Sequence, residues 1–304
     1  MNWYRGFEAC VREEVPLAGM TTYKVGGPAQ FLAEPSSLDV LGALLSRAHD
    51  SGVPLRLLGR GTNLLVADSG VRGLVLRLDR SGFGTLRRSG NQVFAGAGCS
   101  LPALVKWSVT QGLSGLECLQ GVPGTVGAAL RMNAGGRHGE ICQTVRSVRG
   151  FVRDGKPFQL SREECGFIYR NSGLSGRIVT ECELELCEGD PAQSKKMLAD
   201  ILQAKCATQP LSARSAGCAF KNPKQPGVSP AGKLIDDLGL KGMRAGGAVV
   251  SNLHANFLVC EGAATAADLC RLIRIIRERV FEAHGIRLEL EVEVWGVQAE
   301  ELAA

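Results

Sequence analysis

The chain has 304 residues and a formal net charge of +5, and 45% of its residues are hydrophobic while 21% are charged. This composition is typical of a globular protein and excludes disordered and collagen-like chains. At about 150 residues per domain, the length predicts two domains. No apolar run approaches the ~18 residues of a membrane-spanning helix, and the first residues lack the apolar segment of a signal peptide. We therefore expect a cytoplasmic protein that does not associate with membranes.

The cysteine, histidine and basic residues argue against two further classes of function. The 11 cysteines are scattered without a Cys-x-x-Cys pair, and the 4 histidines are isolated. We therefore expect no metal site and interpret most cysteines as small buried side chains. The basic residues form no run with interleaved aromatic residues, which argues against nucleic-acid binding.

Short apolar strands alternate with helical patterns along the chain, as in α/β and α+β folds. We expect the first helix to be capped by Ser36 or Ser37 and to end at Gly52 and Pro54. A second helix begins near 100–102, with proline in its first turn. A polar-faced helix covers about 191–205. Strands are expected at 31–34, 55–58, 64–66, 74–78, 147–152 and 177–186.

The C-terminal part contains two further periodic segments. Residues 265–268 (TAAD) are a variant of the capping box, with Asp in place of Glu or Gln, and they open a helix with one apolar stripe. Residues 288–295 alternate apolar and acidic side chains. We expect them to form a strand with Glu289, Glu291 and Glu293 on its polar face.

Two glycine-rich segments are suited to bringing backbone N–H groups close to an anion. The first, 59–63 (GRGTN), follows a predicted strand. The second is 121–134, and its first part, 121–129, contains too much glycine for an ordinary helix. Glycine permits positive φ angles and close approach, and successive N–H groups form an anion-binding nest. Neither segment is a Walker A or a GxGxxG motif. Each loop alone is equally well explained as a tight turn, but two that face one another from separate subdomains favour a diphosphate between them.

Seven motifs, taken together, resemble one enzyme family. They are TTYKVGGPA (21–29), LGRGTNLL (58–65), GVPGTVG (121–127), MNAG (132–135), FIYRNS (167–172), SAGCAFKNP (215–223) and LEVEVWG (290–296). Their residues and their order are similar to those of the UDP-N-acetylenolpyruvoylglucosamine reductase (MurB) family, over roughly residues 20–296. One such motif is weak evidence, whereas seven in order are highly specific.

The resemblance implies an α+β protein with an FAD-binding PCMH-type fold, like that of vanillyl-alcohol oxidase, followed by a C-terminal α+β substrate-binding domain. The FAD-binding domain is expected at 1–202, with subdomains at about 1–80 and 81–202, and the substrate-binding domain at 203–304. The resemblance also implies FAD bound without a covalent link. By motif position, its contacts are Arg60, Gly61, Thr62, Asn63, Leu64, Gly121, Val122, Pro123, Gly124, Thr125, Gly127, Ala128 and Asn133.

The resemblance further implies the reaction. The family reduces the enolpyruvyl ether of UDP-N-acetylglucosamine to UDP-N-acetylmuramate with NADPH, in peptidoglycan biosynthesis. Hydride passes from the reduced flavin N5 to the terminal carbon of the enol ether, and negative charge then accumulates on the carboxylate side as an enolate. Such a reaction needs a cation to stabilise the enolate and a proton donor for the α-carbon.

Three residues take these roles by motif position. Arg170 offers a two-pronged donor to a carboxylate, although such an arginine standing alone is more often a surface ion-pair partner. Cys218 is the proton donor, where better-known family members carry serine, and its alternative is a buried inert cysteine. Glu291 shares or relays the proton, and only the family register distinguishes it from the neighbouring glutamates. The implied substrate contacts are Tyr169, Asn222 and Lys221.

Two other classes of function stay open from the residues alone: a PCMH-type oxidase of alcohols or sugars, and a non-catalytic nucleotide-binding module. Many such oxidases tether flavin through histidine or cysteine, and the histidine near a glycine loop is His138. We expect the flavin to be released on denaturation. The resemblance implies a monomer that binds a UDP-sugar. No ribose-recognition motif separates NADPH from NADH.

Overall fold

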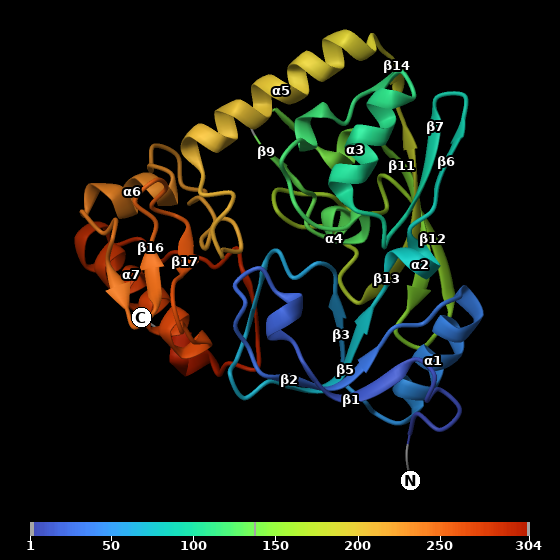
Figure 1. The fold of residues 1–304 in the computed structure, drawn as a ribbon, viewed down its shortest axis with the longest axis horizontal. Coiled ribbons are helices and arrows are strands. Elements are labelled where there is room, and N and C mark those ends of the chain that lie inside the picture. The colour runs from blue at the N-terminus through green and yellow to red at the C-terminus, as the bar shows by residue number, and fades with distance from the viewer. Residues whose placement is uncertain (1–2, 137, 303–304) are drawn as a thin grey trace. The chain divides into compact units, whose positions relative to one another are not determined.

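The computed structural model of the protein describes residues 3–136 and 138–302 (Figure 1). Two compact units make up the chain. The first consists of Met1–Glu13, Phe31–Arg60 and Gly73–Ala204, and the second of Glu14–Gln30, Gly61–Arg72 and Lys205–Ala304. The chain passes from the first unit to the second between Arg60 and Gly61, so the first glycine loop has residues in both.

The first unit contains a five-stranded antiparallel sheet with the strand order β12-β11-β13-β7-β6. Its strands are β6 (Leu86–Ser89), β7 (Gln92–Gly96), β11 (Val145–Val152), β12 (Pro157–Ser161) and β13 (Arg177–Glu185). Alternate side chains of a strand point to opposite faces. Cys182 and Leu184 of β13 are therefore buried, whereas Glu181 faces outward and pairs with Arg87 and Arg149 at 2.9 and 2.6 Å.

A second sheet has the order β1-β2-β5-β3, with strands β1 (Val11–Pro16), β2 (Pro28–Ala33), β5 (Val71–Arg77) and β3 (Leu55–Leu58). Helix α1 (Leu38–Asp50) connects β2 to β3 (Figure 1). The prediction of its cap is confirmed for Ser37, whose hydroxyl accepts a hydrogen bond from the Val40 N–H at 3.3 Å. The buried stripe of α1 consists of Leu41, Leu44, Leu45 and Ala48.

Two helices flank the second glycine loop. Helix α3 (Leu101–Thr110) has proline in its first turn, as predicted. The prediction that 121–129 forms no helix was wrong, because α4 (Val126–Arg131) begins inside this segment. Thr125 caps α4, and Gly127 allows the helix to approach β7 and its following turn, since a Cβ on Gly127 would lie 3.0 Å from the Ala97 Cβ.

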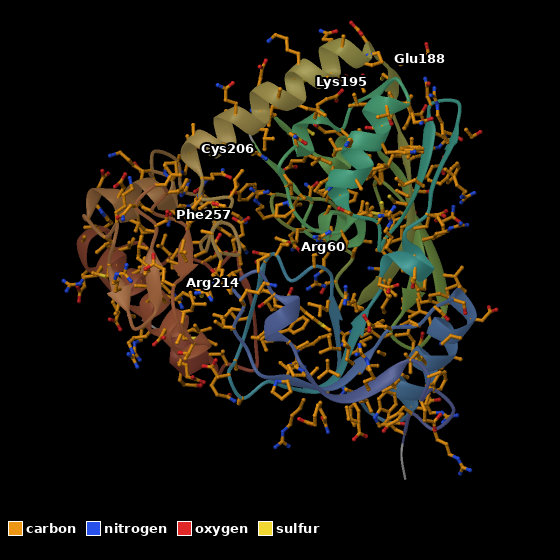
Figure 2. The ribbon with its side chains drawn as sticks, viewed as in Figure 1. Arg60, Glu188, Lys195, Cys206, Arg214 and Phe257 are labelled. Carbon is orange, nitrogen blue, oxygen red and sulfur yellow. The ribbon has the colours of Figure 1, made fainter. Side chains whose placement is uncertain are left out.

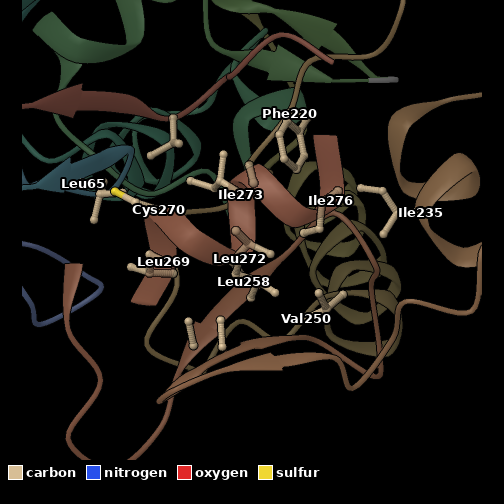
Figure 3. Close-up of a cluster of buried hydrophobic side chains, with 14 of the residues drawn as sticks. Leu65, Phe220, Ile235, Val250, Leu258, Leu269, Cys270, Leu272, Ile273 and Ile276 are labelled. Atoms are coloured by element: carbon tan, nitrogen blue, oxygen red, sulfur yellow. The ribbon is translucent and has the colours of Figure 1, made fainter. Parts of the chain in front are cut away.

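Helix α7 (Ala266–His284) organises the core of the second unit. The predicted capping box is confirmed, with the Asp268 N–H donating to Thr265 Oγ1 and the Thr265 N–H donating to the Asp268 carboxylate, both at 3.1 Å. The predicted apolar stripe is buried among side chains from other elements of this unit (Figure 3). Its members are Leu269, Leu272, Ile273, Ile276 and Val280.

The predicted C-terminal strand is shorter than expected. Only β18 (Glu293–Trp295) is a strand, and it pairs in parallel with β4 (Leu64–Val66). Upstream, Leu290 forms a single antiparallel bridge with Phe220. Because these two neighbours belong to different segments that run in opposite directions, residues 288–295 form no continuous ladder.

The remaining elements are short, apart from one long surface helix. A three-stranded sheet contains β15 (Arg244–Ala245), β16 (Ala248–Val250) and β17 (Leu258–Cys260). One two-stranded sheet pairs β9 (Gly135–Gly136) with β10 (Gly139–Glu140). Another pairs β8 (Leu113–Ser114) with β14 (Cys187–Glu188). The other helices are α2 (Arg80–Phe83), α5 (Pro191–Thr208), α6 (Ala231–Asp237), and the 3-10 turns η1 (Ala18–Met20), η2 (Glu117–Leu119), η3 (Ile141–Gln143) and η4 (Ala299–Leu302). Across 3–136 and 138–302, no helix has the length and apolar character needed to cross a membrane.

The prediction that most cysteines are buried was wrong. Five of the 11 are buried, namely Cys99, Cys165, Cys182, Cys260 and Cys270. Cys187 and Cys206 are exposed, and the rest are intermediate. Cys206 is exposed because it lies on the surface helix α5, whose buried residues are Ser194 and Ile201.

The two compact units are not the two predicted domains. The predicted boundary lies at 202/203, and the last change of unit lies at Ala204/Lys205. However, Glu14–Gln30 and Gly61–Arg72 are grouped with the C-terminal residues. The domains 1–202 and 203–304 stay a prediction about how the chain folds.

The first turn of helix α7 offers a stability test, because a residue distant in sequence accepts hydrogen bonds from its N–H groups. The Asp68 carboxylate accepts hydrogen bonds from the N–H groups of Ala266 and Ala267 at 2.9 and 3.0 Å. We expect Asp68→Ala to lower the free energy of unfolding by about 1–2 kcal/mol, the usual cost of losing a helix cap, as measured by urea denaturation. Glu282→Ala, exposed on the same helix, should change it by about 0.5 kcal/mol or less. Equal losses would contradict this role of Asp68.

Candidate active site

The first glycine loop is held in shape by the motif at 21–29. The Gly61 carbonyl accepts hydrogen bonds from the N–H of Thr22 at 3.1 Å and from its hydroxyl at 3.2 Å. Gly61 has φ +62°, and a Cβ there would lie 2.2 Å from the Met20 carbonyl oxygen. Only glycine therefore fits this position, and Thr22 gives a physical reason for the first motif.

The backbone of this loop can bind an anion. Within residues 3–136 and 138–302, no protein acceptor lies within hydrogen-bonding reach of the N–H groups of Gly61 and Thr62. Successive N–H groups of this kind form a nest for a phosphate. Arg60, which precedes them, is exposed (Figure 2).

In the second glycine loop, some N–H groups donate to acceptors in the protein and others do not. The N–H of Val122, Gly127 and Ala128 donate to Leu119 O, Ala97 O and Thr125 Oγ1. For Gly121 and Gly124, by contrast, the described residues supply no acceptor. Both have positive φ angles, +73° and +125°. Gly121 and Gly124 thus keep donors for an anion, while the N–H groups of Val122, Gly127 and Ala128 are used within the protein.

The two glycine loops meet within the first unit. A Cβ on Gly59 would lie 3.2 Å from Thr125 Oγ1 and 3.4 Å from the Ala128 Cβ. Gly59 directly follows β3, and Thr125 directly precedes α4. The start of the first loop and the second loop therefore lie side by side within the first unit, and the N–H groups of Gly121 and Gly124 suit a phosphate of FAD.

Asn133 has a more specific environment than the other predicted cofactor residues. It is buried, with 1% exposure, and has a positive φ of 46°. Its Nδ2 donates to Glu140 Oε2 at 2.7 Å and to Ile168 O at 3.2 Å, while its Oδ1 accepts from the Cys142 N–H at 3.3 Å. Both donors of this amide are used inside the protein.

Arg170 lies in a tight turn with an unusual backbone. Its φ is 56°, a conformation that costs a non-glycine residue about 1–3 kcal/mol and is concentrated at functional sites. The N–H groups of Ile168 and Asn171 donate to each other's carbonyls at 3.0 and 3.1 Å. Arg170 Nη1 donates to Gly135 O at 2.8 Å, and its guanidinium carbon lies 5.5 Å from the centre of the Tyr169 ring.

The turn also exposes apolar surface beside the guanidinium. Ile168 and Tyr169 are 57% and 42% exposed, which is high for side chains of this size. A cation next to exposed aliphatic and aromatic groups suits a ligand that has both an anionic and an apolar part. The sequence-based interpretation of Tyr169 as a ligand contact is compatible with this exposure.

Cys218 belongs to a segment of the second unit and forms an isolated antiparallel bridge with Phe257. The segment is fastened by Asn256, a buried residue that the sequence analysis missed. The Phe220 N–H donates to Asn256 Oδ1 at 2.9 Å, and Asn256 Nδ2 donates to Phe220 O at 2.8 Å. The Cys218 side chain is partly exposed, so it is not the buried inert cysteine of the alternative interpretation.

Tyr23 is a second residue that the sequence analysis missed. It is 1% exposed and forms a hydrogen bond with the backbone of Ala216, two residues before Cys218. Burial raises the pKa of its phenol, and the nearby thiols of Cys260 and Cys218 raise it further. Tyr23 stays protonated at neutral pH, and the signal for it was its place inside the 21–29 motif.

Glu291 differs from its two neighbours in burial and contacts. It is partly buried, whereas Glu289 and Glu293 are exposed. Its N–H donates to Ala219 O at 2.8 Å, and its carbonyl accepts from Asn63 Nδ2 at 2.9 Å. The structure therefore distinguishes the glutamate that the strand pattern alone did not.

Lys221 and Asn222 both have partners inside the second unit. Lys221 Nζ lies 3.4 Å from Glu289 Oε2 in an exposed pair. Asn222 Oδ1 accepts a hydrogen bond from the N–H of Ala231, the first residue of α6, at 3.1 Å. Each residue keeps donor groups, and neither is positioned by burial.

Each unit thus contains part of the predicted site. The first unit holds Arg60, Asn133, Tyr169, Arg170 and residues 121–128. The second holds Cys218, Lys221, Asn222, Glu291 and residues 61–64. Within the second unit, Asn63, Ala219 and Glu291 are linked directly by hydrogen bonds.

The glycine at position 61 can be tested against a matched control. Gly61→Ala and Gly52→Ala both place alanine at a φ near +60°, but Gly52 has nothing within 4 Å of an added Cβ. We expect Gly52→Ala to lower the free energy of unfolding by about 1–2 kcal/mol. Gly61→Ala should cost about 2–5 kcal/mol because the clash with Met20 adds about 1–3 kcal/mol. Chemical denaturation measures both, and equal losses would show that the contact with Met20 is unimportant.

Comparisons with known proteins agree on one family. Residues 209–295 match the family model described as UDP-N-acetylenolpyruvoylglucosamine reductase, C-terminal domain. Residues 29–161 match the FAD binding domain, so the cofactor of the chain is FAD. The expected PCMH-type flavoprotein fold is thereby confirmed.

Individual relatives match over nearly their whole length. The chain is 43% identical to UDP-N-acetylenolpyruvoylglucosamine reductase 2 of Symbiobacterium thermophilum, over 94% of this chain and 92% of the relative. It is 42% identical to the reductase of Synechococcus sp. strain WH7803, with coverages of 95% and 94%. The crystal structure of the Thermus caldophilus reductase superposes with a TM-score of 0.82 at 44% identity, covering 94% of this chain and 99% of that one. The chain therefore belongs to the UDP-N-acetylenolpyruvoylglucosamine reductase (MurB) family of FAD-dependent oxidoreductases.

Proposed function

We propose that this protein reduces UDP-N-acetylenolpyruvoylglucosamine to UDP-N-acetylmuramate, with NADPH as the electron donor to its FAD. Relatives at 42–43% identity over most of the chain carry the name of this reductase. The residues that the family motifs assign to the reaction all lie in described parts of the chain. Since the substrate is a nucleotide sugar and the donor is NADPH, we also propose a cytoplasmic enzyme. The resemblance to the family implies that it is a monomer.

One observation carries the proposal. Asn63 Nδ2 donates to the Glu291 carbonyl at 2.9 Å across 228 positions of sequence, and the Glu291 N–H donates to Ala219 O at 2.8 Å. Ala219 directly follows Cys218. The end of the first glycine loop, Glu291 and the segment that carries Cys218 are therefore neighbours within the second unit, which supports their assignment to one site.

The glycine loops would hold the cofactor. When bound, FAD supplies the two-electron chemistry, taking a hydride from NADPH and delivering it to the terminal carbon of the enolpyruvyl group. The N–H groups of Gly61, Thr62, Gly121 and Gly124 would contact its phosphates, and glycine at 59 and 127 lets the loop backbones approach. The remaining proposed contacts are Arg60, Asn63, Leu64, Val122, Pro123, Thr125 and Ala128.

Arg170 is assigned to the substrate carboxylate. Its guanidinium has five N–H donors, and the bond from Nη1 to Gly135 O orients the group. A carboxylate bound by this fork gains stabilisation as the negative charge of the enolate develops. Tyr169 and Ile168 would cover the enolpyruvyl group and exclude water, which strengthens this attraction.

Cys218 and Glu291 are assigned to the proton. Addition of hydride to the terminal carbon moves the π-electron pair of the double bond to the carboxylate side as an enolate. The Cys218 thiol then gives its proton to the α-carbon, the C–H bond forms from the enolate pair, and the sulfur keeps the S–H pair as a thiolate. Glu291 would relay a solvent proton that restores the thiol. These steps consume one hydride and one proton, as reduction of a double bond requires.

Lys221 and Asn222 are assigned to the UDP part of the substrate. The Asn222 carbonyl oxygen is engaged by Ala231, so its Nδ2 is the donor it would offer. Lys221 would exchange its exposed partner Glu289 for a phosphate, at low cost because such surface pairs contribute about 0–1 kcal/mol.

Substitution of Cys218 separates the two half-reactions. We expect Cys218→Ala to be bleached by NADPH at close to the normal rate but to reduce the enolpyruvyl sugar about 10²–10⁴-fold more slowly, the usual contribution of a general acid. Cys218→Ser should retain appreciable activity because the hydroxyl also carries a proton. Stopped-flow absorbance of the flavin measures both steps, with Cys206→Ala, exposed on α5 (Figure 2), as the control. A folded Cys218→Ala protein that NADPH no longer reduces would contradict the assignment.

The type of flavin attachment distinguishes the reductase from a PCMH-type oxidase. We expect acid or heat denaturation to release all yellow colour into the supernatant after precipitation, because the proposed contacts with FAD are non-covalent. A measurement of oxygen consumption with alcohols and sugars should show no turnover. Colour retained on the precipitated protein, or rapid oxygen consumption, would favour the oxidase. A colourless protein that fails to bind added FAD would favour a non-catalytic nucleotide-binding module.

A further inference from the structure

We propose that Asn133 is a positioning residue for Arg170, acting through the turn at 168–171, rather than a direct contact of the cofactor. This inference rests on the proposed function, in which Arg170 binds the substrate carboxylate. The turn and Asn133 both belong to the first unit. Asn133 lies in the short link between α4 and β9 (Figure 1).

The first step is that the Arg170 turn needs an external restraint. Arg170 has a φ of 56°, which an L-residue other than glycine adopts at a cost. Within the turn, Ile168 and Asn171 form a pair of backbone hydrogen bonds. The turn also carries large side chains at 168 and 169 that are 57% and 42% exposed, so their burial stabilises it only in part. A conformation of this kind persists only where its surroundings hold it.

The second step is that the 131–135 segment holds the turn at three points. Asn133 Nδ2 donates to Ile168 O at 3.2 Å, before Arg170 in the chain. Ser172 Oγ donates to Arg131 O at 2.8 Å, after it. The Arg170 guanidinium itself donates to Gly135 O at 2.8 Å. The residues on both sides of Arg170 and its guanidinium are therefore all hydrogen-bonded to residues 131–135.

The third step is that the Asn133 amide cannot rotate freely. Its second N–H is bound by the Glu140 carboxylate at 2.7 Å, and its Oδ1 accepts from the Cys142 N–H at 3.3 Å. A flipped amide would set its oxygen against the Glu140 carboxylate and the Ile168 carbonyl, where all three groups are acceptors. Bonds to a charged acceptor are about twice as strong as neutral ones. Glu140 thus fixes the orientation in which Asn133 reaches the turn.

The fourth step concerns the residue type. Asn133 has a φ of 46° and is 1% exposed. Asparagine tolerates this backbone region better than most residues, and its short amide supplies two donors and one acceptor at a fixed separation. Both donors are used within the protein, so a side-chain hydrogen bond to the cofactor would require breaking one of them. The position therefore suits a residue that orients another residue.

The test uses Asn133→Gly, because glycine adopts the positive φ without strain and removes the side chain that binds the turn. We expect normal flavin content and reduction by NADPH within about twofold of the unsubstituted enzyme. Oxidation of the reduced flavin by the enolpyruvyl sugar should slow by on the order of 10- to 100-fold, the effect of misplacing a reacting group by about 1 Å. Hydrogen exchange at the Ile168 and Asn171 amides should rise, while exchange at buried strand β13 stays unchanged.

A double-mutant cycle with Arg170→Ala distinguishes positioning from general damage. If Asn133 acts through Arg170, Asn133→Gly should cost the substrate half-reaction less than about threefold in the Arg170→Ala background. Independent, multiplicative losses would overturn the inference. Loss of FAD from Asn133→Gly would overturn it in favour of the cofactor contact. Unchanged exchange at 168–171 would overturn it as well.

The same measurements separate this inference from the proposed function. If the unsubstituted enzyme fails to turn over the enolpyruvyl sugar, the proposed function fails. The exchange data then decide alone whether Asn133 holds the turn. If that enzyme turns over and the cycle is multiplicative, the proposed function stands and the inference fails. Asn133→Asp serves as the second variant, because it places a carboxyl group against the Glu140 carboxylate. Burial and the like charge raise the pKa of this carboxyl, so it should loosen the turn more at pH 8, where it is ionised, than at pH 5.

Discussion

The backbone of Glu291 connects parts of the chain that are distant in sequence. Its carbonyl is bound by the Asn63 amide, and its N–H binds the carbonyl of Ala219, next to Cys218. Two residues further on, the Glu293 N–H donates to Asn63 O at 3.0 Å, where β18 begins its pairing with β4. Backbone groups make most of these bonds. They therefore fix the path of the chain at residue 291 and depend little on which side chains it carries.

Strain and its restraint recur in the first unit. Arg170 and Asn133 both have positive φ angles, and hydrogen bonds join their segments at several points. Such conformations are concentrated where a function needs a particular geometry and the surroundings maintain it. Gly61 and Gly124 also have positive φ angles, but without strain, because glycine adopts them at little steric cost and leaves N–H groups accessible. In the proposed function, residues with a strained backbone orient the Arg170 guanidinium that binds the substrate, whereas glycines form the cofactor cradle.

Capping residues and buried stripes explain why several elements were predictable. The hydroxyl of Ser37, the proline after Ser100 and the Thr265–Asp268 box are local signals, since each acts on the turn next to it in sequence. The stripe from Leu269 to Val280 follows from the helical period alone. Helix α4 and strand β18 were mispredicted for the converse reason. Gly127 is tolerated in a helix because it packs on Ala97, and residues 288–292 lose their ladder because their neighbours run in different directions.

Local patterns by themselves determined the starts of α1, α3 and α7, the apolar stripes and the two glycine loops of this protein, and the order of its motifs determined the family. These features depend on residues close in sequence or on their order along the chain. Only the tertiary structure decided which of three glutamates is partly buried, that Thr22 holds Gly61, and that Asn133 binds the turn of Arg170. Each of these depends on contacts between residues dozens of positions apart or more, which a local pattern does not encode.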